Sequence, residues 1–199
     1  MKLKLEHKSL VVFSVALLVT LAIGSFVYIY EIPPLIYNGW EQGFVQKGAG
    51  GGSIPVNTLY TEPNLLNPNS TEANPSVAGG DPGLLYTVGV LDLSKGPVIL
   101  SVPAFADRYY DIELVDSRGD DFAYVGSQAT GGQAGNFLIS GPGWQGTLPA
   151  GVTQIKSPDN SVLLLGRVLV QNAGDVSAAY NLSEQMHLTL LSDWQPAAG

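Results

Sequence analysis

Residues 86–93 of the chain read YTVGVLDL, and this stretch decides the fold. Similar short apolar runs follow it along the chain, namely PVILSVP at residues 97–103, RYYDIELVD at 108–116, NFLIS at 136–140 and SVLLLGRVLV at 161–170. Glycine, proline, aspartate and asparagine lie between the runs. Runs rich in Val, Ile, Leu and Tyr that end at turn residues are typical of a compact all-β domain.

The spacing of the turn residues predicts where the elements lie. A helical pattern covers residues 176–182, and residues 185–191 suit either a closing strand or a short helix. Residues 55–60 are typical of a first strand or of a turn that enters a short helix. Seven further strands are expected near residues 84–92, 97–102, 108–116, 121–127, 136–140, 152–156 and 162–171.

An uncharged run of 22 residues, at positions 9–30, is long enough to span a membrane. A helix rises about 1.5 Å per residue and the hydrocarbon core is roughly 30 Å thick. Lys2, Lys4 and Lys8 precede the run and Glu31 follows it, so the positive-inside rule predicts a cytoplasmic N-terminus. We expect an uncleaved anchor in the plasma (inner) membrane and a periplasmic or extracellular domain; a cleaved signal peptide is the alternative.

The segment after the run should form an arm and a linker. The pair Pro33-Pro34 is expected to end the helix, and the glycine-rich residues 47–53 predict a flexible linker that separates the membrane part from the folded part. The expected organisation is a cytoplasmic stub with a transmembrane helix at 1–30, an interfacial arm and linker at 31–54, a β-rich ectodomain at 55–192 and a tail at 193–199.

Apolar side chains give the arm a helical stripe. Ile36, Trp40 and Phe44 recur every four residues, with Leu35 at the edge of the stripe. The stripe is either an interface at the membrane or an arm that packs on the domain. Trp144, in a Gly-Pro-Gly-Trp turn, is a second candidate contact for a partner, although a turn aromatic can equally fold onto the sheets.

Composition excludes several classes of function. The chain has no cysteine, so it has no disulfide and no cysteine-ligated metal. Residues 31–199 hold six Lys and Arg against sixteen Asp and Glu, and such an acidic domain repels nucleic acid. His187 is the single histidine of this part, which excludes a multi-histidine metal site, and we expect no cofactor.

These motifs, taken in order, resemble the domain-of-unknown-function 1254 family over residues 56–191. The resemblance rests on YTVGVLDLSKGP at 86–97, RYY at 108–110, GPGW at 141–144, LPAG at 148–151 and LGR at 165–167. It implies a β-sandwich-like or jelly-roll-like domain that is often secreted or membrane-anchored, and it brings no established reaction.

Two departures from the family pattern bear on function. Where relatives commonly have Asn-x-Asp-Thr-Leu-Tyr, this chain has DPGLLY at residues 81–86, so most of that polar cluster is replaced. Family members also often continue into a second β-rich domain, of the 1214 family. The chain is therefore expected to be a single-domain, membrane-anchored member.

Carboxylates are the most frequent candidates for chemistry. Alternation along residues 108–116 places Ile112 and Leu114 in the core and Asp111 and Glu113 on the opposite face, which we expect to be solvated. Oxygen ligands for Ca²⁺ could come from Asp116, Asp120 and Asp121, although their spacing is not that of an EF-hand loop.

The two arginines among the apolar runs favour structural roles. Arg108 and Arg167 are expected to pair with Asp92 or Asp116 and to fix strand ends, and an anion-binding site is the alternative. The catalytic alternative, a hydrolase of unknown substrate, would use a site made of Asp81, Tyr86, Asp92 and Arg108.

The preferred prediction is a non-catalytic accessory or scaffold subunit of a membrane protein complex. Its partners would be the lipid bilayer and other membrane subunits, contacted through the transmembrane helix and the ectodomain. A self-associating cell-surface module that pairs through sheet edges is a further alternative.

Overall fold

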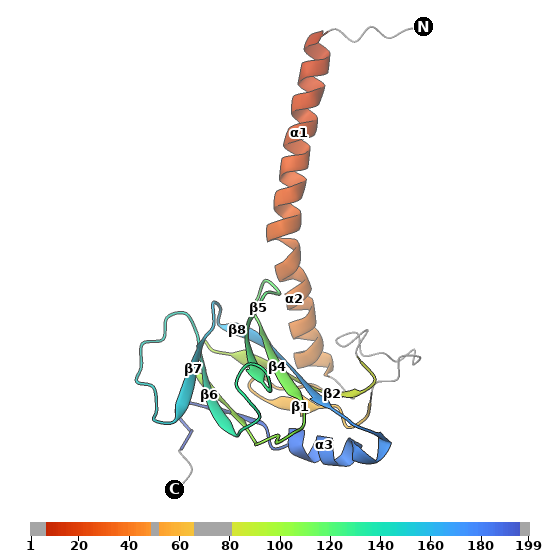
Figure 1. The fold of residues 1–199 in the computed structure, drawn as a ribbon. Helices are drawn as coiled ribbons and strands as arrows, with labels where there is room; N and C mark the ends of the chain where they lie inside the picture. Colours follow the sequence, from red (N-terminus) through yellow and green to blue (C-terminus); the bar gives the residue numbers. More distant parts are fainter. Residues whose placement is uncertain (1–6, 49–51, 66–80, 196–199) are drawn as a thin grey trace.

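The computed structural model describes residues 7–48, 52–65 and 81–195. Helical segments at the N-terminus lead into a β domain made of two sheets (Figure 1). The elements are α1 (His7–Tyr30), α2 (Ile32–Gln42), η1 (Gly43–Lys47), β1 (Leu59–Thr61), β2 (Leu84–Asp92), β3 (Val98–Val102), β4 (Tyr110–Val115), β5 (Asp121–Gly126), β6 (Gly135–Ser140), β7 (Val152–Lys156), β8 (Ser161–Leu169), η3 (Ala173–Asp175), α3 (Val176–Ser183) and β9 (His187–Leu190).

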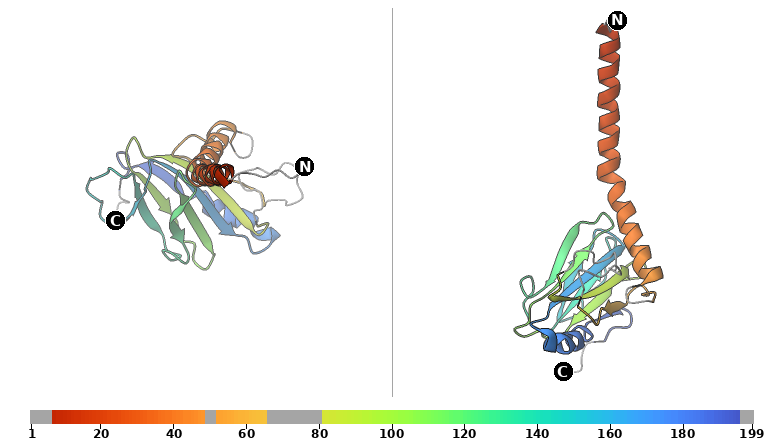
Figure 2. Two further views of the ribbon diagram at one scale, coloured as in Figure 1. Left: turned by 90° about the horizontal axis from the view of Figure 1, so that it is seen from above. Right: turned by 90° about the vertical axis from the view of Figure 1, so that its right-hand side faces the viewer.

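The N-terminal helix projects away from the sheets and is long and apolar enough to cross a membrane (Figure 1). None of the residues in the most apolar part of the stretch Ser9–Lys47 is buried. A bend follows Tyr30, where α2 begins with Pro33 and Pro34 in its first turn (Figure 2). Proline lacks an N–H and suits the first turn of a helix, so these residues end α1 and start α2.

The larger sheet has the strand order β1-β2-β8-β4-β5, and all its neighbours are antiparallel. Its longest pairing joins β2 to β8 over nine residues, from Leu84 opposite Leu169 to Asp92 opposite Ser161. The smaller sheet has the order β7-β6-β3-β9, in which only the β6–β7 pair is parallel.

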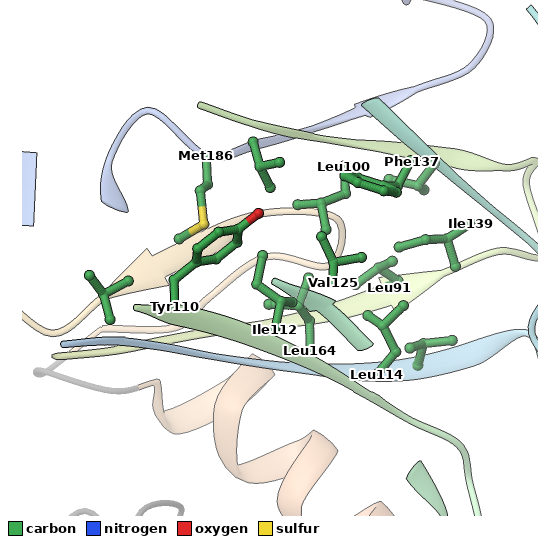
Figure 3. Packing of buried hydrophobic residues seen from close by; sticks show 14 of the residues in the cluster. Leu91, Leu100, Tyr110, Ile112, Leu114, Val125, Phe137, Ile139, Leu164 and Met186 are labelled. Carbon is green, nitrogen blue, oxygen red and sulfur yellow. The ribbon is translucent and has the colours of Figure 1, made fainter. Parts of the chain in front are cut away.

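A shared hydrophobic core joins the two sheets. Its side chains come from strands of both sheets, and from α3 and the segment after it (Figure 3). The ring of Tyr110 stacks on Phe105 at 3.9 Å between centroids, and its hydroxyl donates to the carbonyl of Gly131 at 3.3 Å. The fully buried members include Leu85, Leu91, Leu100, Ile112, Leu114, Ile139 and Leu164.

Helix α2 and the turn η1 pack on the outer face of the larger sheet. Tyr37 and Phe44 are buried there in a cluster with Val88, Val90 and Leu163. The hydroxyl of Tyr37 also shares a hydrogen bond of 2.9 Å with the Ser161 hydroxyl. The helical arm therefore packs on the β domain. This is the second of the two interpretations of its apolar stripe, an arm that packs on the domain.

The centre of the predicted glycine-rich linker, residues 49–51, lies outside the described residues, whereas the segments on either side of it are in contact. The N–H of Ile54 donates to the carbonyl of Phe44 at 3.2 Å, so Ile54 lies against η1. Gly48 has a φ of 72°, and a Cβ there would lie 1.1 Å from the Gly52 carbonyl oxygen. Glycine at position 48 therefore permits both the positive φ and the close approach to Gly52.

The expected strands are confirmed to within two residues at most ends. β2 and β7 have the predicted bounds, and residues 187–190 form a strand, β9, rather than a short helix. The first element expected in the β domain, near residues 55–60, is the short strand β1. Residues 61–83 contain four prolines and are expected to form a long polar loop, and they lie largely outside the described residues.

Candidate functional site

The outer face of the larger sheet is only partly covered by α2. Along β4 and β8 the residues Ile112, Leu114 and Leu164 enter the core, so their neighbours point outward. This alternation places Asp111, Glu113 and Arg167 together on the outer face. That part of the face forms the candidate site.

Arg167 joins the two carboxylates. Its Nη1 donates to Asp111 at 2.7 Å, and its Nη2 forms a short ion pair with Glu113. The three side chains are 27%, 17% and 13% exposed, respectively. Burial lowers the pKa of Arg167, but Asp111 and Glu113 outweigh burial and raise this pKa overall. The guanidinium is a permanent cation whose terminal nitrogens are both occupied.

This pairing corrects two expectations. Arg167 contacts neither Asp92 nor Asp116, which lie toward the other end of the sheet. Asp111 and Glu113 are not a solvated strand face, because the cross-strand neighbour of Asp111 is Arg167. The sequence does not show the strand order, and so it could not reveal that β8 lies beside β4.

Tyr124 extends the cluster on the edge strand β5. Its hydroxyl donates to Asp121 at 2.8 Å and lies 3.3 Å from Glu113. The hydrogen bond to Asp121, followed by burial, raises the pKa of Tyr124 to about 12. Burial and the neighbouring Asp121 raise the pKa of Glu113, despite the ion pair with Arg167.

A pocket of about 570 Å³ opens beside this cluster. The tyrosines on it keep 38% and 44% of their surface exposed, for Tyr109 and Tyr124 respectively. Both aromatic and charged groups therefore face the same space. The lining residues are Leu84, Tyr109, Asp111, Tyr124, Val125, Gly126, Gln128, Ala129 and Arg167.

Arg108 forms a separate, structural ion pair. Its Nη1 and Nη2 donate to the two carboxylate oxygens of Asp175 at 2.6 and 2.7 Å, and Nη1 also donates to the Leu169 carbonyl. The expected partners of Arg108, Asp92 and Asp116, are wrong. The pair instead fastens the start of α3 to the end of β8.

Asp175→Asn should lower the free energy of unfolding near neutral pH. The Arg108 hydrogen bond and then the Gln171 N–H hold the pKa of Asp175 at about 2, below its ordinary value. A depressed carboxyl pKa stabilises the fold above the unfolded pKa of about 4, and this contribution is lost as the pH falls toward about 2.

Urea unfolding of wild type and Asp175→Asn between pH 6 and pH 2 measures this effect. The difference between the two proteins should shrink with falling pH, while exposed Asp107→Asn should match wild type throughout. A difference that stays constant with pH would contradict the role given to the Asp175 charge.

The four catalytic candidates do not meet in one place. The N–H of Asp81 donates to the Tyr86 hydroxyl at 2.8 Å, and Arg108 lies near the same end of β2, because it contacts Leu169 opposite Leu84. Asp92 ends β2 eight residues from its start, about 25 Å away at the usual rise of a strand. Its carboxylate instead accepts hydrogen bonds from Ser94, which lower the pKa of Asp92.

The calcium candidates are used for the hairpin between β4 and β5. One carboxylate oxygen of Asp116 accepts the N–H groups of Arg118 and Asp120, at 2.8 and 3.0 Å. Asp121 accepts the Tyr124 hydroxyl. Within residues 7–48, 52–65 and 81–195, no group of three His, Asp or Glu side chains could hold a metal ion.

The interface candidates divide into exposed and buried residues. Leu35, Ile36 and Trp40 are 68%, 50% and 45% exposed, whereas Phe44 is 2% exposed and packs on the sheet. Trp144 is half-buried and packs against the cluster of Ile99, Leu138 and Val152 on the smaller sheet. Only the first three candidates on the arm offer an apolar surface.

The pocket itself was not anticipated. Tyr109 belongs to the RYY motif that carries the family resemblance, but no role was assigned to its ring. Strand alternation placed Tyr109 and Asp111 on one face, and this was the available signal. The contribution of Tyr124 required knowledge of the β4–β5 register, in which Glu113 pairs with Tyr124.

The protein is a mainly β domain of two sheets that follows an apolar N-terminal helix. The chain belongs to the family described as "Protein of unknown function (DUF1254)", whose model matches residues 56–190. This confirms the family assignment suggested by the sequence motifs. A search of the curated proteins returns no match.

Two solved structures resemble the chain. The VPA0106 protein from Vibrio parahaemolyticus matches with a TM-score of 0.63 and 25% identity, over 87% of this chain and 40% of that chain. A putative uncharacterized protein from Burkholderia cenocepacia has a TM-score of 0.43 and 14% identity, over 70% of this chain and 36% of that chain. The chain thus spans less than half the length of either protein.

Proposed function

We propose that the chain is a single-pass, non-catalytic accessory or scaffold subunit of a membrane protein complex. In this proposal α1 spans the plasma (inner) membrane with a cytoplasmic N-terminus. The β-sandwich-like domain then lies on the periplasmic or extracellular side. The lysines at positions 2, 4 and 8 and Glu31 after the run support that orientation.

The observation that carries the proposal is the two-sided use of α2. The helix is held on the sheet by Tyr37 of α2 and by Phe44 of the following turn η1, and both side chains are nearly fully buried. Another part of the helix exposes Leu35, Ile36 and Trp40, directly after the apolar span. A docked helix loses little conformational freedom when a partner covers it, which favours binding.

The catalytic alternative receives less support from the geometry. Asp92 lies at the far end of β2 from Asp81 and Tyr86, and Asp175 occupies Arg108. A reaction that required these four side chains together would need a different arrangement of the sheet. A self-associating module would instead pair through sheet edges, and the composition of the oligomer distinguishes such a module from a subunit of a mixed complex.

Trp40→Glu tests the proposed contact surface. A charge at this position should reduce partner retention by roughly tenfold or more, because aromatic anchors contribute disproportionately to interfaces. The measurement is the amount of partner protein that co-purifies with the full chain after gentle detergent extraction. Gln46→Glu adds the same charge at an exposed position of η1 and should retain the partner as wild type does.

Equal retention by both variants would overturn the assignment of α2 as the contact surface. An assembly that contains only copies of this chain would instead favour the self-associating module. The melting temperature of each variant checks that the β domain remains folded.

A further inference from the structure

The pocket on the outer face has aromatic walls and lies in a region where carboxylates outnumber cationic side chains. Tyr109 and Tyr124 line it from the β4 and β5 side, and their rings are partly exposed. The face of an aromatic ring is electron-rich and attracts a cation within about 6 Å. Both tyrosine rings that line the pocket can therefore attract a cation.

The charged groups around the pocket point to the same sign of ligand. The charged residues of the lining are Asp111 and Arg167, which form an ion pair. Next to the lining, Glu113 also pairs with Arg167 and Asp121 accepts the Tyr124 hydroxyl, so three carboxylates accompany one guanidinium in this region. The guanidinium already holds a carboxylate on each terminal nitrogen. An anionic ligand would have to displace one of these carboxylates, whereas a cation is attracted by the surplus of carboxylates over the single guanidinium.

The remaining lining is apolar. Leu84, Val125 and Ala129 contribute hydrocarbon surface, and Gly126 brings the backbone close to the space. A volume of about 570 Å³ lies within the usual range for small-ligand sites. A ligand that suits all these groups has a cationic head and a short hydrocarbon body.

We propose that the pocket between Tyr109, Tyr124 and Asp111 binds a small organic cation, namely an alkylammonium group. The ammonium head lies against the tyrosine rings and the Asp111 carboxylate, and the alkyl body contacts Leu84 and Val125. The site is independent of the α2 surface, because it uses the part of the sheet that the helix leaves uncovered.

Binding of n-butylammonium to the full chain in nanodiscs tests the proposal. The signals of ¹³C-labelled tyrosine rings report occupancy, with those of Tyr109 and Tyr124 expected to shift saturably. 1-Butanol and acetate, measured at the same concentrations, provide the neutral and anionic comparisons. Neither should cause saturable shifts at these two rings.

Two substitutions of Tyr124 distinguish the contribution of its ring to binding from that of its hydroxyl. Tyr124→Leu should weaken n-butylammonium binding by about fivefold, the size of one cation–π contact at a partly exposed site. Tyr124→Phe keeps the ring and should bind within about twofold of wild type. Tyr109→Leu provides a second removal of a wall, should Tyr124→Leu prove unstable.

Three results would overturn the proposal. One is binding of 1-butanol as tight as that of n-butylammonium, which would reflect apolar contact alone. Another is saturable binding of acetate at the two rings. The last is unchanged affinity in folded Tyr124→Leu and Tyr109→Leu proteins, whose melting temperatures establish that the fold persists.

Discussion

Arg167→Met should lower the free energy of unfolding of the β domain by about 2 kcal/mol. The substitution leaves Asp111 and Glu113 side by side without a cation, although both carboxylates are largely buried. Removing one partner of a fully buried pair costs roughly 3–5 kcal/mol, and partial exposure of this cluster reduces the value. Urea unfolding of the full chain at pH 7, followed by tryptophan fluorescence, measures the change.

A matched control and a rescue sharpen this test. Arg118→Met removes an arginine from the exposed hairpin tip and should change stability by at most about 0.5 kcal/mol. Adding Asp111→Asn and Glu113→Gln to Arg167→Met should recover part of the loss, because the like charges are gone. If Arg167→Met were as stable as Arg118→Met, the cluster would not be the stabilising feature described above.

The double substitution Tyr37→Ala and Phe44→Ala should release α2 from the β domain. Each truncation removes a side chain that is at most 2% exposed, and a buried aromatic truncated to alanine costs about 3–5 kcal/mol. The β domain should remain folded, because these residues belong to a separate cluster from the core between the sheets.

Distance measurements between two spin labels would detect the release. The chain has no cysteine, so Leu35→Cys and Thr153→Cys provide unique exposed attachment points on α2 and β7. The distance distribution should be narrow in the otherwise wild-type protein and broad in the double variant. Gln42→Ala, at an exposed position of α2, should keep it narrow; a narrow distribution in the double variant would contradict docking by Tyr37 and Phe44.

Local sequence patterns predicted the elements of the fold well. Alternation in residues 108–116 placed Ile112 and Leu114 in the core, and turn residues bounded β2 and β7 correctly. The bend after Tyr30 followed from the two prolines in the same way. These features depend on residues close together in the chain, which is why a single sequence reveals them.

Contacts between distant residues could not be predicted in this way. Arg108 finds Asp175 and Arg167 finds Asp111 and Glu113, because β8 inserts between β2 and β4. The apolar stripe on the arm was also misjudged in one respect. Phe44 turns inward with Tyr37, seven residues earlier, while Ile36 and Trp40 remain exposed.

The exposed part of α2 and the pocket are two separate surfaces of the protein. The α2 surface follows the stretch that is long and apolar enough to cross a membrane, and it exposes apolar side chains. The pocket combines aromatic, charged and apolar side chains and lies on the uncovered part of the same sheet. A scaffold that holds a partner through one surface leaves the other available to a small ligand.

Gentle extraction of the full chain from its native membrane, followed by mass spectrometry of the co-purifying proteins, tests the proposed function most directly. If the chain is a subunit, a different membrane protein should be recovered in a fixed stoichiometric ratio to it. The Trp40→Glu variant should no longer retain that protein. Recovery of the wild-type chain as a monomer, without any stoichiometric partner, would contradict the proposed role as a subunit.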